Sequence, residues 1–219
     1  MSDHASEPAA FEFTAPLSVC VDVKHPLAYL ALGPVRALAA ELAVDVDWLP
    51  FPVAPLQAPP AAGAPADRGT RHRRIRARYL GRDIERYAAV QALTIRGLYR
   101  APDSTPASLG LLWLRARAPE HVAECLERLF AGYWQEQLDV EDPNAVAGVL
   151  AALGQDPAQF AAFAEGPGPA ELASLRARLV AAGVFAVPSL VVEGEVFVGR
   201  AHLPMARWLL QGRTGAPPI

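Results

Sequence analysis

The chain has 219 residues and a mass of 23.4 kDa, which is enough for one compact domain or for a domain that carries a large insertion. Hydrophobic residues make up 52% of it, so a sizeable core can be buried and wholesale disorder is excluded. The 20 basic and 23 acidic residues give a net charge of −3. This near balance argues against a general nucleic-acid binder, and no nucleic-acid partner is expected.

Residues 1–14 contain acidic side chains and lack the basic segment followed by an apolar one that marks a signal peptide. We expect these residues to form a disordered tail. The sequence has no run of about 18 apolar residues, so no membrane-spanning helix is expected. The prediction is a cytoplasmic protein without a membrane partner.

The two cysteines, Cys20 and Cys125, lie far apart in the sequence and form no CxxC pair. This count excludes a disulfide scaffold and a cysteine-based zinc site, and each cysteine is expected to be inert core. His72, His121 and His202 lack the spacing of metal ligands, so no metal is expected.

The N-terminal part of the chain has the pattern strand, helix, strand. Residues 17–23 (LSVCVDV) are short, β-rich and almost continuously apolar, which is typical of a strand buried on both faces. A helical pattern follows over residues 26–43, and it starts at Pro26, where a missing N–H costs nothing. Residues 44–51 alternate between apolar and polar types and predict a second strand.

Helices are expected to dominate the middle of the chain. Residues 52–70 are rich in Pro, Ala and Gly and should form no regular element. Helical patterns follow at residues 71–93, 109–117 and 120–138. Two more helices should begin at Asp142-Pro143 and at Asp156-Pro157, because the carboxylate caps the first turn and proline is tolerated there.

The C-terminal segment predicts a hairpin and a helix. Two β-rich runs flank Glu193-Gly194, which has the composition of a tight turn. Pro188 stands at the entrance to the first run, where an ordinary trans proline would spoil sheet pairing. A cis Val187-Pro188 bond resolves that conflict by turning the chain sharply. Leu203-Pro204 then opens a terminal helix.

This order of elements predicts an α/β fold of the thioredoxin type, with a large inserted all-helical domain and a cis proline before the third strand. The predicted thioredoxin-like domain comprises residues 15–54 and 183–213. The helical insertion domain comprises residues 68–182.

Five segments carry patterns that are more specific than the fold. They are residues 22–31 (DVKHPLAYLA), 76–87 (RARYLGRDIERY), 133–143 (YWQEQLDVEDP), 183–189 (GVFAVPS) and 193–197 (EGEVF). They resemble, in that order, the segments D-F-x-S-P-x-S-Y-L-A, K-A-R-Y…D-L-x-R-W, Y-W…D-I-x-D-P, G-V-F-G-V-P-T and D-G-E-x-F of the 2-hydroxychromene-2-carboxylate isomerases. The chain is identified as a member of the DsbA-like superfamily, in the branch of these isomerases and the kappa-class glutathione transferases.

The resemblance implies glutathione-dependent isomerisation of an aromatic carboxylate. The family serine that hydrogen-bonds the glutathione sulfur aligns with His25, so His25 is the candidate catalytic residue. An imidazole can donate an N–H to a thiolate or take the thiol proton. Lys24 is the only lysine in the chain, and we expect it to attract a substrate carboxylate.

The resemblance also implies a glutathione site with two departures from the family. Val187, before Pro188, would pair its backbone with the extended peptide, and Arg76 stands where the family often has a lysine that contacts an anion. Ala201 replaces an aspartate whose region receives the γ-glutamyl amine. Arg200 beside it would repel an ammonium group.

Two functions of different classes remain open. The first is a glutathione-dependent cis–trans isomerase, or a related transferase, that acts on a small aromatic carboxylate. The second is a non-catalytic protein of the same fold that binds a small ligand in a repurposed cleft. Disulfide oxidoreductase activity is disfavoured, because His25 and Ala28 stand where a CxxC pair would be needed. The tryptophans at positions 113, 134 and 208 indicate core or homodimer packing.

Overall fold

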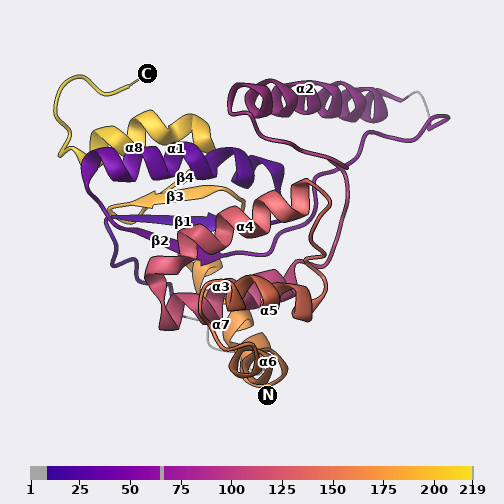
Figure 1. Ribbon diagram of the computed structural model, residues 1–219. Coiled ribbons are helices and arrows are strands. Elements are labelled where there is room, and N and C mark those ends of the chain that lie inside the picture. The colour runs from indigo at the N-terminus through magenta and orange to yellow at the C-terminus, as the bar shows by residue number, and fades with distance from the viewer. Residues whose placement is uncertain (1–8, 65–66, 219) are drawn as a thin grey trace, which may run out of the picture.

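The computed structural model describes residues 9–64 and 67–218 and has one four-stranded sheet, with the strand order β2-β1-β3-β4 (Figure 1). β1 (Leu17–Val21) and β2 (Val46–Pro50) are parallel. β3 (Ser189–Val192) pairs antiparallel with β1, and β4 (Glu195–Val198) pairs antiparallel with β3. Every residue of β1 is buried, as its continuous apolar sequence predicts.

Helices cover both faces of the sheet. α1 (Pro26–Leu42), which connects β1 to β2, lies on one face together with α8 (Leu203–Leu210) (Figure 1). The chain between β2 and β3 forms α2 (Arg68–Val90), α3 (Thr105–Arg117), α4 (Val122–Trp134), α5 (Pro143–Ala151), α6 (Pro157–Glu165) and α7 (Gly168–Ala181). Short 3₁₀ turns span Pro119–His121 and Arg200–His202. Within the described residues, no helix is long and apolar enough to cross a membrane.

The predicted fold is confirmed, including the cis Val187-Pro188 bond. The helix boundaries differ at several places: α2 ends at Val90 rather than at residue 93, and α4 spans Val122–Trp134 rather than residues 120–138. Two of the different starts have a clear local cause. α2 begins at Arg68 rather than at residue 71, because the Asp67 side chain caps it by accepting the Thr70 N–H at 2.8 Å. α3 begins at Thr105 rather than at residue 109, with a proline in its first turn.

The sequence analysis did not identify α7 as a separate helix. Gly168 and Pro169 open it, and both residue types ordinarily interrupt helices. In the first helical turn, however, a proline removes an N–H that has no partner within the helix. Leu172, Leu175 and Leu179 then form the buried side of the helix.

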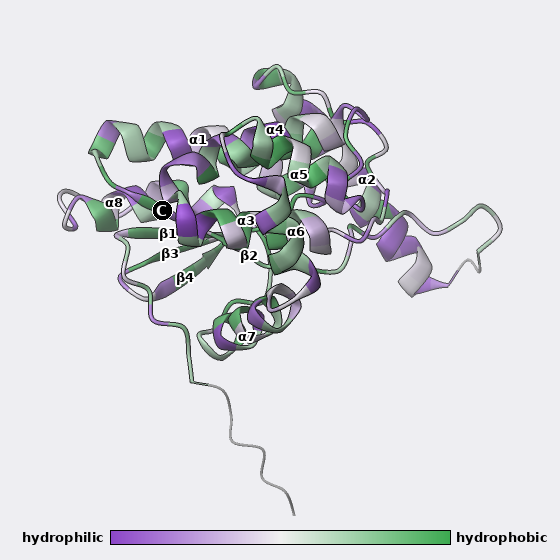
Figure 2. Ribbon diagram, turned by 60° about the horizontal axis from the view of Figure 1, so that its bottom comes forward, coloured by the Kyte–Doolittle hydropathy of each residue, from purple (hydrophilic) through white to green (hydrophobic). Residues whose placement is uncertain are grey.

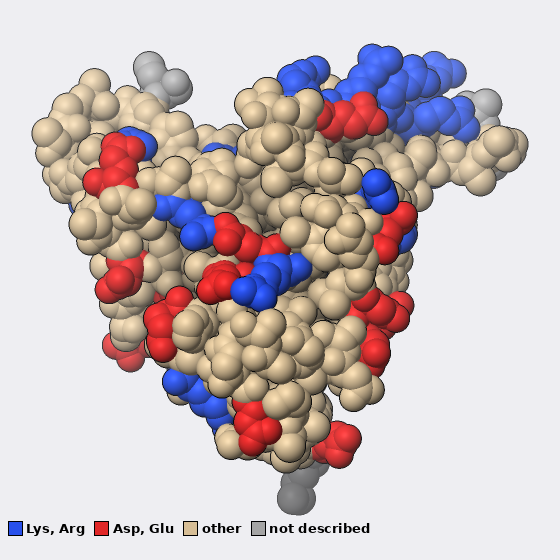
Figure 3. All heavy atoms as spheres, in the orientation of Figure 1, with Lys and Arg blue, Asp and Glu red and all other residues tan. Residues whose placement is uncertain are grey.

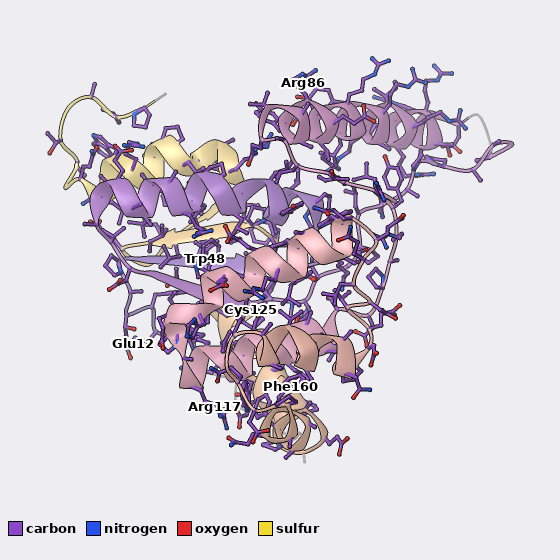
Figure 4. All side chains as sticks on the ribbon, in the orientation of Figure 1. Glu12, Trp48, Arg86, Arg117, Cys125 and Phe160 are labelled. Carbon is purple, nitrogen blue, oxygen red and sulfur yellow. The ribbon has the colours of Figure 1, made fainter. Side chains whose placement is uncertain are left out.

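The main hydrophobic core is continuous between the sheet and the helices that follow β2. It joins Val19 and Leu190 of the sheet to Trp113 and Phe130 of the helices. Figure 2 shows hydrophobic stretches along these helices, and the side chains of Trp48, Cys125 and Phe160, labelled in Figure 4, are buried. The division of the chain into domains at residues 68 and 182 stays a prediction.

Residues 9–14 of the predicted tail are described, and two of their aromatic side chains pack on the body of the protein. Residues 1–8 of the predicted tail lie outside the described residues. The Phe11 N–H donates to the Arg178 carbonyl at 2.9 Å, and the rings of Phe11 and Phe13 meet edge to face at 5.0 Å. Both rings are partly buried against a cluster that includes Leu175 and Leu179 of α7, and the disorder of the tail stays a prediction.

Candidate functional site

His25 stands at the junction between β1 and α1. Its backbone is extended, and its carbonyl accepts the N–H groups of Ala28 and Tyr29 at 3.0 and 3.3 Å, so it occupies the N-cap position of α1. The imidazole does not cap the helix. Its Nδ1 atom is buried and has no hydrogen-bond partner among the described residues. Most buried polar atoms in proteins are hydrogen-bonded, so this nitrogen marks an unusual position in the structure.

The surroundings of His25 favour the neutral imidazole. Burial lowers the pKa of His25 below its ordinary value of 6.5, and this effect exceeds the opposing influence of Asp22, which raises the pKa. Lys24 lowers the pKa further. At neutral pH His25 is therefore uncharged, with one nitrogen free to accept a proton and the other able to donate one.

Lys24, the only lysine, lies in a buried ion pair. It is 8% exposed, and its Nζ lies 3.2 Å from the Asp22 Oδ2 atom and donates to the Ser104 Oγ atom at 2.9 Å. Ser104 precedes α3, so the Lys24 ammonium links the loop before α1 to the start of α3. The predicted attraction of a substrate carboxylate by Lys24 does not fit this arrangement, since its charge is already compensated. We assign Lys24 a structural role.

Asp22 and Trp134 hold the loop before α1 in place. The Asp22 carboxylate accepts the backbone N–H of Lys24 at 3.2 Å and that of Val53 at 2.8 Å. The Trp134 Nε1–H donates to the Val23 carbonyl at 3.1 Å. The Asp22 carboxylate and the Trp134 indole are buried and hydrogen-bonded, so they fix the path of the loop that carries His25.

A cavity of about 260 Å³ lies between the start of α1, the segment after β2 and one side of α2. His25 and Arg76, two of the residues predicted for the site, both line it. His72 and Arg73 also line it, although the sequence analysis treated neither as functional. His72 and Arg73 precede Arg76 by four and three residues, a spacing that places the three side chains on one side of a helix. This spacing is the sequence signal that could have identified them.

The cis Val187-Pro188 bond immediately precedes β3. Cys20 of β1 pairs with Ser189 of β3, so the chain before Ser189 runs beside the chain that leads to His25. Neither backbone polar group of Val187 has a hydrogen-bond partner among the described residues, whereas the Pro188 carbonyl accepts the Gly199 N–H at 2.8 Å. Neither residue lines the cavity described above.

Arg200 joins the end of the hairpin to α2. Its guanidinium donates to the Asp83 Oδ2 atom at 3.3 Å and lies 3.4 Å from the centre of the Tyr87 ring. The predicted repulsion of an ammonium group by Arg200 is therefore reduced, since Asp83 compensates its charge. Ala201 beside it is exposed and supplies no carboxylate. Neither residue lines the cavity with His25.

Both cysteines are buried, and this burial makes their thiols unreactive. Cys20 lies within β1 and Cys125 within α4, and both have 0% exposure. Burial raises the pKa of each thiol to about 12. Thiolate formation at neutral pH is therefore negligible, and neither cysteine is a candidate nucleophile.

We expect the native protein to give no fast reaction with a thiol-specific disulfide reagent at neutral pH, whereas the unfolded protein should react at both cysteines. For the same reason it should neither reduce insulin disulfides nor oxidise a reduced peptide. If the native protein reacted with the reagent as fast as a free thiol does and released one equivalent of its thiolate anion, this expectation would be wrong.

The fold and the site define a thioredoxin-fold protein whose α1 N-terminus carries a histidine instead of a redox-active cysteine pair. No group of three or more metal-binding side chains is found in the described part of the chain. The family model for the DSBA-like thioredoxin domain matches residues 17–211, and the chain belongs to this family.

Three similar proteins cover most of this chain. A 2-hydroxychromene-2-carboxylate isomerase from Sphingobium xenophagum is 25% identical over 190 residues, which cover 83% of this chain and 91% of the relative. A solved structure of a 2-hydroxychromene-2-carboxylate isomerase superposes with a TM-score of 0.64 at 18% identity, over 91% of this chain and 94% of the other. The cytosolic disulfide reductase DsbM from Pseudomonas aeruginosa, solved with GSH, gives a TM-score of 0.56 at 21% identity, over 90% and 98% of the two chains.

Proposed function

We propose that the protein is a glutathione-dependent cis–trans isomerase, or a related transferase, that acts on a small unsaturated aromatic carboxylate. The observation that carries this proposal is the neutral, half-buried imidazole of His25 at the N-terminus of α1, beside a cavity that Arg76 also lines. The similarity to an isomerase over most of both chains supports the reaction class. The cytosolic relative solved with GSH supports the cofactor and a cytoplasmic setting.

The residues around His25 fit a thiol. The first turn of α1 presents the backbone N–H of Leu27 and the positive end of the helix dipole, which together favour a thiolate. The neutral imidazole of His25, which lines the cavity, can accept the thiol proton and later return it. When bound, glutathione would supply a nucleophile that adds reversibly to a conjugated carbon, so that the double bond becomes single, rotates and forms again.

The fit to the rest of glutathione is incomplete. The backbone of Val187 has unpaired N–H and C=O groups, which suit an extended peptide. Arg76 can contact an anionic group. Ala201, however, offers no carboxylate to the γ-glutamyl ammonium.

Titration calorimetry with glutathione tests the proposal. We expect weak binding by the native protein and tighter binding, by about 1 kcal/mol or more, after Ala201→Asp restores the carboxylate. His202→Asp is a matched control, because it places the same charge one residue further along the exposed turn. Undetectable binding by both the native protein and Ala201→Asp would reject a family-type glutathione site.

The alternative is a protein that binds a small ligand without turnover. Its support is the same pair of departures, His25 for the family serine and Ala201 for the family aspartate. The alternative predicts ligand binding in the His25 cavity that does not depend on any thiol.

A further inference from the structure

A second cavity, of about 620 Å³, lies where α4 ends. It is formed by the last turn of α4, by the segment that follows this helix and by the segment before α3. Its charged lining residues are Arg100, Glu136, Asp139 and Glu141. Figure 3 shows basic side chains gathered over α2 and acidic side chains at the edge of the molecule below it. An excess of negative charge in a cavity favours a cationic ligand.

The carboxylates of this cavity are not neutralised within the described part of the protein. Asp139 and Glu141 form no ion pair there, and one oxygen of each accepts a backbone N–H, at 2.9 and 2.8 Å. Glu136 lies 3.9 Å from the Arg100 Nε atom, which is a long separation for an ion pair. Arg100 itself is held elsewhere, because it donates to the Tyr133 carbonyl at 2.7 Å and lies 4.3 Å from the centre of the Tyr133 ring. Negative charge therefore remains available to a ligand.

Tyr133 adds a buried hydroxyl that has no partner. The residue lines the cavity and is 3% exposed, and its hydroxyl makes no hydrogen bond with another described residue. Burial raises the pKa of Tyr133; Arg100 lowers this pKa, whereas Asp22 and Glu141 raise it further. The phenol therefore stays protonated at neutral pH and lies close to Glu141, a carboxylate of the cavity wall. A ligand that pairs with this hydroxyl, directly or through one water, satisfies a group that the protein leaves unsatisfied.

The other lining residues include apolar side chains. Pro102 comes from the segment before α3, and Leu138 and Val140 come from the segment after α4. The cavity volume lies within the range of small-ligand pockets, which measure about 300–1,000 Å³. An inorganic cation would gain nothing from this apolar wall, whereas an organic cation buries its body against it. The ligand that fits is therefore a small organic cation.

We propose that this cavity is a second ligand site and that its ligand is a small organic amine in its ammonium form. The ammonium lies between the carboxylates of Glu136 and Asp139 and the hydroxyl of Tyr133, with the apolar body against Pro102 and Leu138. An ammonium has three donors, so it can pair with these acceptors at the same time. The inference is independent of the proposed function, because the two cavities share no lining residue.

Titration of the full-length protein with benzylamine, followed by NMR, tests this site. Benzylamine carries an ammonium group at neutral pH, and benzyl alcohol is its uncharged counterpart of similar shape. We expect benzylamine to bind the native protein about tenfold more tightly than benzyl alcohol does, or more. Glu136→Gln/Asp139→Asn should weaken benzylamine binding by about tenfold or more. Asp139→Asn keeps the side-chain oxygen that accepts the Glu141 N–H, so the turn is preserved.

Tyr133→Phe removes the hydroxyl and keeps the ring. We expect it to weaken benzylamine binding about threefold to tenfold, the effect of one hydrogen bond. The urea midpoint of the unliganded variant should not fall, because the native hydroxyl has no hydrogen bond to lose. If the hydroxyl were merely structural, the midpoint would fall and the benzylamine affinity would stay unchanged.

Glu120→Gln/Glu124→Gln is the matched control. It removes the same number of charges at the opposite end of α4, where both carboxylates are exposed. We expect it to change the benzylamine affinity by less than about twofold, because solvent and salt screen these charges. The inference would be overturned if benzylamine did not bind the native protein or bound no better than benzyl alcohol. It would equally be overturned if both cavity variants bound benzylamine normally or if the control weakened binding as much as they do.

Discussion

Lys24→Met is expected to lower the free energy of unfolding by about 3 to 5 kcal/mol. The substitution keeps most of the side-chain volume but leaves the Asp22 carboxylate, whose side chain has 0% exposure, without its cation. It also removes the donor to the Ser104 hydroxyl, which is itself fully buried. Urea unfolding followed by circular dichroism measures the difference.

The controls separate the buried ion pair from the general loss of a charge. Arg36→Met breaks the ion pair with Glu127 on the surface, where both side chains are more than 40% exposed, and should cost no more than about 1 kcal/mol. Adding Asp22→Asn to Lys24→Met removes the uncompensated charge and should recover part of the loss. If Lys24→Met were as stable as Arg36→Met, the structural role of Lys24 would be wrong.

Most of the fold could be predicted from the sequence because its signals are local. The apolar run of β1, the Asp-Pro starts of α5 and α6, and the proline before β3 each restrict the backbone within a few residues. α7 was missed for the same reason, since its local Gly-Pro start indicates a break and only its packing shows a helix.

The site was less predictable because its charges are set by partners that are distant in the sequence. Lys24 donates to Ser104, which lies 80 residues away, and Arg200 donates to Asp83, which lies 117 residues away. Both cations are therefore held by contacts within the folded protein. Nothing in the sequence next to Lys24 or Arg200 reveals these pairs. His25 and Arg76, by contrast, stand in recognisable segments, and the fold brings them to one cavity; their functional roles stay a prediction.

His25→Ala is expected to reduce any isomerase rate by about 100-fold or more, which is typical for the loss of one positioned group that transfers a proton or stabilises charge. The same variant should abolish the ultraviolet absorbance of thiolate that appears when glutathione is added to the native protein. His25→Ser supplies a hydroxyl that can donate to a thiolate but is a far weaker proton acceptor, so it should recover part of the activity.

His121→Ala is the matched control, because His121 lies in a 3₁₀ turn with a half-exposed side chain beside Glu120 and should leave both signals unchanged. The acid limb of the pH profile gives a further test. Since burial lowers the pKa of His25, its imidazole stays neutral to below pH 6.5, and the rate should fall only when the pH drops through this lowered pKa. If both His25 variants retained the native rate and thiolate signal, His25 would have no part in thiol chemistry, and the small-ligand-binding function would replace the isomerase.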